Sequence, residues 1–129
     1  MPDLVRLSLI AGIGGFAGTI VRFLTSRYIQ AASSSGFPFG TFAVNITGCL
    51  LIGILYGLSE KGEILNAEWR LFLAVGFCGG LTTFSAFAQE NFSLVREGDF
   101  FLFALYTSLS VFLGLIAVFF GNLIIQKIF

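Results

Sequence analysis

The sequence predicts an all-α membrane protein with four transmembrane helices, of which the third is broken. Two observations support this prediction. Only 11% of the 129 residues are charged while 57% are apolar, whereas a soluble domain is typically about 25% charged. The chain also holds four stretches long enough for a membrane helix, which needs about 20 mostly apolar residues to cross about 30 Å of hydrocarbon. One of these stretches is interrupted by the run GGLTT.

Charged and turn-forming residues set the limits of the four spans. The first apolar stretch opens without a basic region and runs on to Arg22, so we expect it to be retained rather than cleaved as a signal peptide. The turn sequence SSSGFP at 33–38 places the start of the second span at about residue 39. The two later connections are too short for a soluble domain. We predict a single membrane domain, residues 1–129, with spans at about 4–28, 39–58, 70–92 and 100–126.

The remaining composition narrows the possible partners to the lipid bilayer and other membrane segments. Seven basic and seven acidic residues cancel, so no nucleic-acid or soluble partner is indicated, and the chain has no histidine. Cys49 and Cys78 both lie in apolar stretches, where a thiol behaves as a small hydrophobe. Two such cysteines form neither a disulfide framework nor a zinc pattern. Nothing in this inventory predicts an enzyme.

Basic residues are spread almost evenly over the two sides of the predicted bundle. Membrane proteins normally place more Lys and Arg on the cytoplasmic side. Here the two sides carry four and three, so the chain could insert in both orientations, and oppositely oriented copies could then associate about a two-fold axis. The side that holds the amino terminus carries Arg6, Lys61, Arg70 and Lys127, and the other carries Arg22, Arg27 and Arg96.

In the first span, Gly14, Gly18 and Arg22 recur on one helical face. Glycines four residues apart allow two helix backbones to approach closely, so this face is predicted to pack on another helix. Arg22 continues the face. Its side chain either points into the bundle, where it would draw anions toward a vestibule, or extends to the lipid headgroups.

The second and fourth spans each carry a row of polar and small residues. Asn45 is the only side-chain amide of the second span and shares a face with Thr41. A lone Asn would be explained as a hydrogen bond between helices, but Tyr106 and Ser110 form a matching row in the fourth span, continued by Gly114. These amide and hydroxyl groups donate hydrogen bonds. Along a dry passage they suit a small, strongly hydrated anion.

The interruption of the third span, residues 79–83, is the sharpest feature. Two glycines followed by two β-branched threonines form poor helix, and unwound backbone within a membrane must be buried in protein or line a cavity. The break would expose carbonyls that can hold a cation and N–H groups that favour an anion. The alternative is a packing kink without a ligand.

Phe84, Ser85 and Phe87 follow the break directly. Most of the 17 phenylalanines are expected to face lipid, but Phe84 and Phe87 lie one helical turn apart beside the break. An aromatic ring has a positive edge. Two such edges could replace water around a halide without holding it too tightly to leave.

The run GFCGGLTTFSAF at 76–87, together with AVNITG at 43–48, resembles the Fluc family of bacterial fluoride channels. The resemblance extends over the whole chain, including the Gly40-Thr41 pair before the asparagine and the Tyr and Ser of the last span. It implies an antiparallel, dual-topology homodimer with two fluoride pores and a central sodium ion. One position departs from the pattern, because Gly114 stands where some members carry a hydroxyl.

The resemblance also implies roles for individual residues. Backbone carbonyls of Gly79 and Thr82 would bind sodium at the dimer axis, Arg22 would line the vestibule, and Glu90 matches an acid that follows the phenylalanines. The implied fluoride pore consists of Asn45, Phe84, Phe87, Ser85, Thr41, Tyr106 and Ser110.

The function predicted from these features is passive, fluoride-selective export across a bacterial inner membrane, without catalysis. A small proton-coupled multidrug exporter would also have four spans, but such exporters carry a glutamate in the first span, and this first span contains no acid. A structural protein would explain the glycines of the first two spans. It would not explain a break joined to Phe84 and Phe87.

Overall fold

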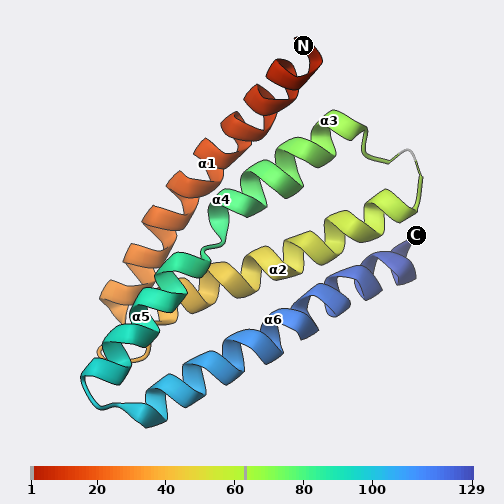
Figure 1. Ribbon diagram of the computed structural model, residues 1–129. Coiled ribbons are helices and arrows are strands. Elements are labelled where there is room, and N and C mark those ends of the chain that lie inside the picture. Colours follow the sequence, from red (N-terminus) through yellow and green to blue (C-terminus); the bar gives the residue numbers. More distant parts are fainter. Residues whose placement is uncertain (1, 63) are drawn as a thin grey trace.

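The computed structural model describes residues 2–62 and 64–129 as a bundle of long helices (Figure 1). The chain forms α1 (Pro2–Ala32), α2 (Phe39–Glu60), an interrupted third span and α6 (Phe100–Ile128). Four helical stretches are long and apolar enough to cross a membrane by length and composition. Both chain ends and the connection after α2 lie at one end of the bundle, and the other two connections lie at the opposite end (Figure 1). The helices run beyond most of the predicted span limits.

The third span consists of short helical segments that follow one another along the chain. It comprises α3 (Ala67–Arg70), the π-helical segment η1 (Leu71–Cys78), α4 (Gly79–Leu81) and α5 (Phe84–Arg96). The predicted break is present but narrower than expected. Only Thr82 (φ −94°, ψ 155°) and Thr83 (φ −151°, ψ 117°) are extended, so the prediction that the glycines are unwound is wrong. The π-helical segment was not predicted from the sequence.

The glycines stay helical because α1 packs closely against their helix. A Cβ added at Gly80 would meet the Gly15 carbonyl oxygen, and one added at Gly18 would meet that of Phe77. Unwound backbone within a membrane needs partners from elsewhere in the protein, and the glycines at this contact keep their helical conformation while admitting α1. The predicted packing face on α1, formed by Gly14 and Gly18, is thus confirmed, and its partner is the first half of the third span.

Helices α2 and α6 form an extensive helix pair within the bundle. Gly53 of α2 lies against the Val118 carbonyl of α6, and Gly121 of α6 lies against the Leu50 carbonyl of α2. Such small residues allow backbones to approach without a side chain between them. This pair forms a fixed wall beside the break.

The second half of the third span, α5, packs on α6 instead of α1. Leu94 of α5 and Tyr106 of α6 are buried together with Phe37 from the first connection, and the Tyr106 side chain is fully buried. The Phe37 and Tyr106 rings meet edge to face, with centroids 5.4 Å apart. The third span therefore changes its packing partner at the break, from α1 before it to α6 after it.

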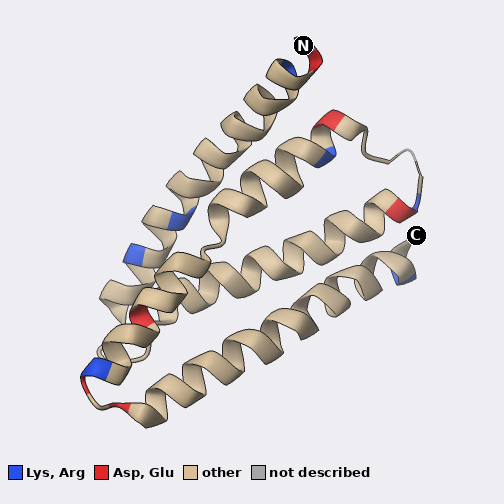
Figure 2. Cartoon of the chain, viewed as in Figure 1, with Lys and Arg blue, Asp and Glu red and all other residues tan. Residues whose placement is uncertain are grey.

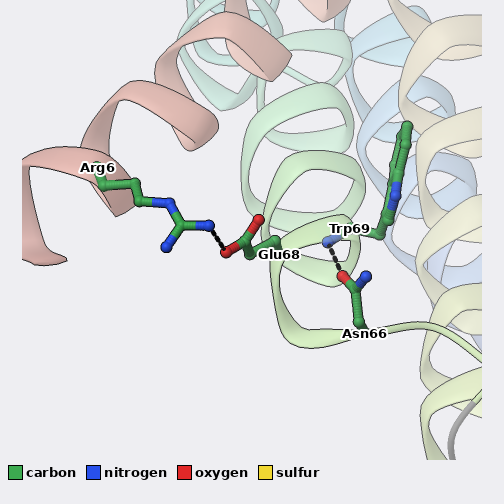
Figure 3. Close-up of polar contacts among 4 residues, drawn as sticks. All are labelled: Arg6, Asn66, Glu68 and Trp69. Atoms are coloured by element: carbon green, nitrogen blue, oxygen red, sulfur yellow. Dashed lines mark hydrogen bonds and ion pairs between the residues drawn. The ribbon is translucent and has the colours of Figure 1, made fainter.

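Most of the length of the helices is uncharged, and many charged residues lie near helix ends, although Arg22 lies within α1 and Glu90 within α5 (Figure 2). At one end, Arg6 of α1 forms an ion pair with Glu68 of α3, and the Asn66 side chain accepts a hydrogen bond from the Trp69 N–H (Figure 3). Large apolar side chains such as Phe119 are exposed on the outer face. An apolar surface of this extent fits a bilayer rather than water.

Candidate functional site at the broken third helix

Asn45 of α2 pairs with the extended backbone of Thr83. Its Oδ1 accepts a hydrogen bond from the Thr83 N–H at 2.7 Å, and its Nδ2 donates one to the Thr83 carbonyl at 3.2 Å. Thr83 has β-type dihedral angles, and the amide satisfies both of its backbone groups as a neighbouring strand would. Asn45 is thereby placed directly at the break.

The break leaves a set of carbonyl oxygens without their helical partners. The Cys78 carbonyl still has its helical donor, the Thr82 N–H at 3.0 Å, and also accepts from the Thr82 hydroxyl at 2.9 Å, so the loss begins at the next residue. The Gly80 carbonyl accepts from Arg22 Nε at 2.9 Å. The Gly79 carbonyl loses its usual donor, because the Thr83 N–H bonds to Asn45 instead.

The Thr82 carbonyl loses its usual donor in the same way. The Ala86 N–H, which would bond to it in a continuous helix, donates to Thr83 Oγ1 at 3.2 Å. This contact makes Thr83 the N-cap of α5, a position that Thr favours. Ser85 is exposed, and its hydroxyl lies 3.2 Å from Thr83 Oγ1.

The Arg22 side chain points into the bundle, as in the first of its two predicted orientations, and does not extend to the lipid headgroups. It is half-buried, and its bond to Gly80 joins α1 to the last turn before the break. A cation at the C-terminal end of a helix interacts favourably with the helix dipole. Arg22 therefore has a structural partner in this chain, the Gly80 carbonyl.

An open pocket of about 350 Å³ lies against the break. Gly48 of the pocket lining makes room for the Thr82 methyl group, because a Cβ added there would collide with it. The pocket brings together four of the predicted pore residues. Its lining residues are Asn45, Gly48, Cys49, Ile52, Thr82, Thr83, Phe84, Phe87, Ser110, Val111 and Val118.

Phe84 and Phe87 stand together at this pocket. Their ring centroids are 5.7 Å apart with planes inclined by 46°. Phe84 is 79% exposed in the single chain, whereas Phe87 is half-buried and lies 5.1 Å from the Tyr106 ring, centroid to centroid. The pair thus reaches from the outer face of the chain toward its core.

Ser110 supplies an unpaired hydroxyl at the same pocket. Its Oγ is buried and has no hydrogen-bond partner in the described chain. An unpaired buried donor is costly unless water or a ligand meets it. One turn further along α6, Gly114 is buried, and a Cβ there would lie 3.5 Å from Cys49 Sγ. This ordinary van der Waals distance shows that a small side chain would fit where the hydroxyl row stops.

Thr41 and Tyr106 lie apart from the pocket lining and meet at Glu90 of α5. Thr41 Oγ1 donates to Glu90 Oε2 at 2.9 Å, and the Tyr106 hydroxyl donates to Glu90 Oε1 at 3.0 Å. Glu90 was matched only to an acid that follows the phenylalanines and was not among the predicted pore residues, although acids within a membrane span are usually functional. Six of the seven predicted pore residues therefore fall into two groups, four at the pocket and two around Glu90, while Ser85 lies exposed beside the break.

A second, more polar pocket of about 400 Å³ opens beside Glu90 at the bundle end that carries the first and third connections. Amide, hydroxyl and carboxylate side chains supply most of its polar surface. It is lined by Gln30, Gly36, Pro38, Gln89, Glu90, Ser93, Leu94 and Glu97. Water can thus reach the Glu90 group from that end.

Comparisons with known proteins agree with the resemblance found in the sequence. Residues 9–122 match the family model described as CrcB-like protein, Camphor Resistance (CrcB). The fluoride-specific ion channel FluC of Chlorobium phaeobacteroides (strain BS1) is 44% identical over 121 residues, 94% of each chain. The FluC proteins of Bacteroides fragilis (strain YCH46) and Pseudomonas putida (strain F1) are 48% and 46% identical. The alignment with the Bacteroides protein covers 85% of this chain and 88% of the relative, and the alignment with the Pseudomonas protein covers 89% and 94%. These matches confirm the resemblance, and the chain belongs to the CrcB/FluC family of multi-pass membrane proteins.

Proposed function

We propose that this chain forms a fluoride-selective ion channel that lets F⁻ leave a bacterial cell passively across the inner membrane. One observation carries the proposal. In a member of a family whose relatives are named fluoride-specific channels, the broken span presents two phenylalanine rings to one pocket, and α6 presents an unpaired hydroxyl to the same pocket. The function needs no catalytic group.

The main physical difficulty is removing water from a small anion inside hydrocarbon. An unsatisfied charge at the bilayer centre costs at least about 3 kcal/mol. Phe84, Phe87 and Ser110 line the pocket, and the Ser110 hydroxyl has no hydrogen-bond partner in the described chain. Asn45 Nδ2 uses one N–H for Thr83, so its second N–H remains for an anion. A small number of donors suits conduction, because the ion must bind well enough to enter the pocket and weakly enough to leave it.

The Glu90 group forms the rest of the proposed polar route. Thr41 and Tyr106 both donate their hydroxyl hydrogens to the Glu90 carboxylate, so each hydroxyl oxygen keeps only its lone pairs for a further partner. Ser85 lies exposed beside the break and Arg22 is held at Gly80. We assign these two residues to the approach to the pocket, where a hydroxyl and a guanidinium favour an anion.

A sodium ion would be held by the carbonyls of Gly79 and Thr82. Both have lost their helical donors to Asn45 and Thr83 side chains, and Gly79 is exposed with open space where a Cβ would be. Hard cations prefer oxygen ligands, and two carbonyls from each of two chains would supply four. Within residues 2–62 and 64–129, no cluster of His, Cys, Asp or Glu offers a different metal site. Bound sodium would neutralise the partial negative charges of these carbonyl oxygens and would join the two subunits.

The partner would be a second copy in the opposite orientation. Phe84 is 79% exposed in the single chain, so the pocket is incomplete without a covering surface, and the balanced basic residues permit both insertions. A cysteine placed at exposed Ser34, with Cys49 and Cys78 changed to Ser, tests the orientation. An impermeant thiol reagent should label about half of the chains from one side of intact cells. Labelling of nearly all or nearly none would contradict dual topology.

Replacing Phe84 separates a channel from a structural protein. With Phe84→Ile, fluoride efflux from proteoliposomes should fall about tenfold, because the ring edge that replaces water is lost, while the oligomer persists on size-exclusion chromatography. Phe119→Ile is the matched control, since Phe119 is 75% exposed on α6 and away from the pocket. Unchanged efflux with Phe84→Ile would assign the pocket a packing role.

A further inference from the structure

The amide of Asn45 makes a pair of hydrogen bonds to one residue across the break. Both of its functional atoms are engaged with Thr83, one with its N–H at 2.7 Å and one with its carbonyl at 3.2 Å. Thr83 would otherwise carry two unpaired backbone groups inside the bundle, since its extended angles remove it from both helices. Unpaired groups at this depth are strongly unfavourable. The pairing thus accounts for how the backbone can be extended there at all.

The position of Thr83 in turn sets the start of α5. Its side chain caps the helix at the Ala86 N–H, and Phe84 is the first residue of that helix. A cap fixes the angle at which a chain enters its helix. The orientations of Phe84 and Phe87 therefore follow from the conformation of Thr83.

We propose that Asn45 is a positioning residue: its amide clamps Thr83 in the extended conformation and thereby aims the Phe84 and Phe87 rings at the pocket. This role explains why an amide stands at position 45. Asp would accept from the Thr83 N–H but could not donate to its carbonyl, and Ser or Ala could not span both groups. The inference deepens the proposed function, because it relies on the ring pair belonging to the pore.

Amide hydrogen exchange of the full chain in lipid nanodiscs, followed by NMR with ¹⁵N-threonine, tests the clamp directly. The neighbouring Thr82 N–H donates to the Cys78 carbonyl, independently of Asn45, and serves as an internal reference. With Asn45→Ala, the Thr83 N–H should exchange about tenfold faster or more, the effect of losing one net hydrogen bond, while Thr82 changes little. Thr47→Ala, on the same helix and exposed, should change neither.

Asn45→Asp provides a second measurement in case the alanine variant does not fold. It keeps the acceptor, so Thr83 N–H protection should remain close to that of the unmodified chain, while the ¹³C resonance of the Thr83 carbonyl should shift because its donor is lost. Equal Thr83 protection in the unmodified and Asn45→Ala chains would overturn the clamp. So would a Thr83 carbonyl resonance that is indifferent to Asn45→Asp.

A ¹⁹F label reads out the positioning step separately. With 4-fluorophenylalanine at position 84, Asn45→Ala should shift or broaden the ring resonance, and Thr47→Ala should leave it unchanged. A resonance unaffected by Asn45→Ala would overturn the positioning role. None of these measurements requires ion flux, so a failed clamp and a failed fluoride channel would be recognised independently.

Discussion

Arg22 of α1 donates a hydrogen bond from its Nε to the Gly80 carbonyl, 2.9 Å away in the last turn before the break. The guanidinium therefore replaces the helical donor that Gly80 loses where the backbone becomes extended. Asn45 does the same for Thr83 from the opposite side. Side chains from two different helices thus hold the interrupted span in place, and the break is a fixed feature rather than a flexible one.

Removing the guanidinium should destabilise the chain. Arg22→Ala leaves the Gly80 carbonyl unpaired, at a cost of about 1–3 kcal/mol in the free energy of unfolding, whereas Arg22→Gln retains a donor and should cost less. Denaturant unfolding in detergent measures both. Arg27→Ala is the control, because Arg27 is exposed and its guanidinium only rests over the Phe23 ring. Equal effects of the changes at Arg22 and Arg27 would contradict the assigned role.

Adding a methyl group to the α1 seam should separate two backbones. Gly18→Ala places a Cβ against the Phe77 carbonyl, which overpacks the seam by about 1–3 kcal/mol. Gly12→Ala, on the same helix with open space around it, should be neutral or slightly stabilising because Ala is the better helix former. The midpoint temperature of aggregation in detergent distinguishes the two. A Gly18→Ala chain as stable as Gly12→Ala would show that the seam is loose.

The unpaired hydroxyl of Ser110 should matter for conduction and not for stability. Ser110→Ala removes no recorded hydrogen bond, so the free energy of unfolding should change by less than about 0.5 kcal/mol. Fluoride efflux should fall about fivefold, the value of one lost hydrogen bond to the ion. Ser108→Ala loses only contacts with the Ala104 and Leu105 carbonyls of its own helix, on an exposed face, and should leave efflux unchanged. Normal efflux with Ser110→Ala would remove this hydroxyl from the proposed pore.

The Glu90 group should contribute to stability through Tyr106. Tyr106→Phe removes the donor to Glu90 Oε1 within a fully buried ring site, which should cost about 1–3 kcal/mol. Tyr56→Phe, at a residue 61% exposed, is the matched control and should cost little. Thermal unfolding of the two variants checks the difference. If both variants unfolded at the same temperature, the hydrogen bond between Tyr106 and Glu90 would contribute nothing measurable to stability.

Sequence reasoning reached the number of spans, the existence of the break and the close packing of Gly14 and Gly18, because each depends on local composition or helical period. It placed the break too early. Glycine is a weak helix former in water, yet at Gly80 it serves to admit α1, a tertiary contact that helix propensity does not encode. The unwound residues are Thr82 and Thr83. Their hydroxyls bond to the flanking helical turns at Cys78 and Ala86, and the Thr83 backbone pairs with Asn45 of α2.

The grouping of the predicted pore residues could not be obtained from spacing alone. Thr41 and Asn45 share a face of α2, yet one contacts Glu90 and the other contacts Thr83. Their separation depends on α5 leaving the line of the third span at the break, which no periodicity in the sequence reveals. The same long-range arrangement explains why Glu90 was not among the predicted pore residues.

Efflux from proteoliposomes, recorded in parallel with fluoride- and chloride-selective electrodes, tests the central claim most directly. Fluoride should leave rapidly only after a potassium ionophore compensates its charge, without an imposed proton gradient, and chloride should remain largely trapped. Chloride leaving as fast as fluoride would contradict selective conduction. Fluoride efflux that is electrically silent and requires a proton gradient would contradict the channel and indicate coupled transport.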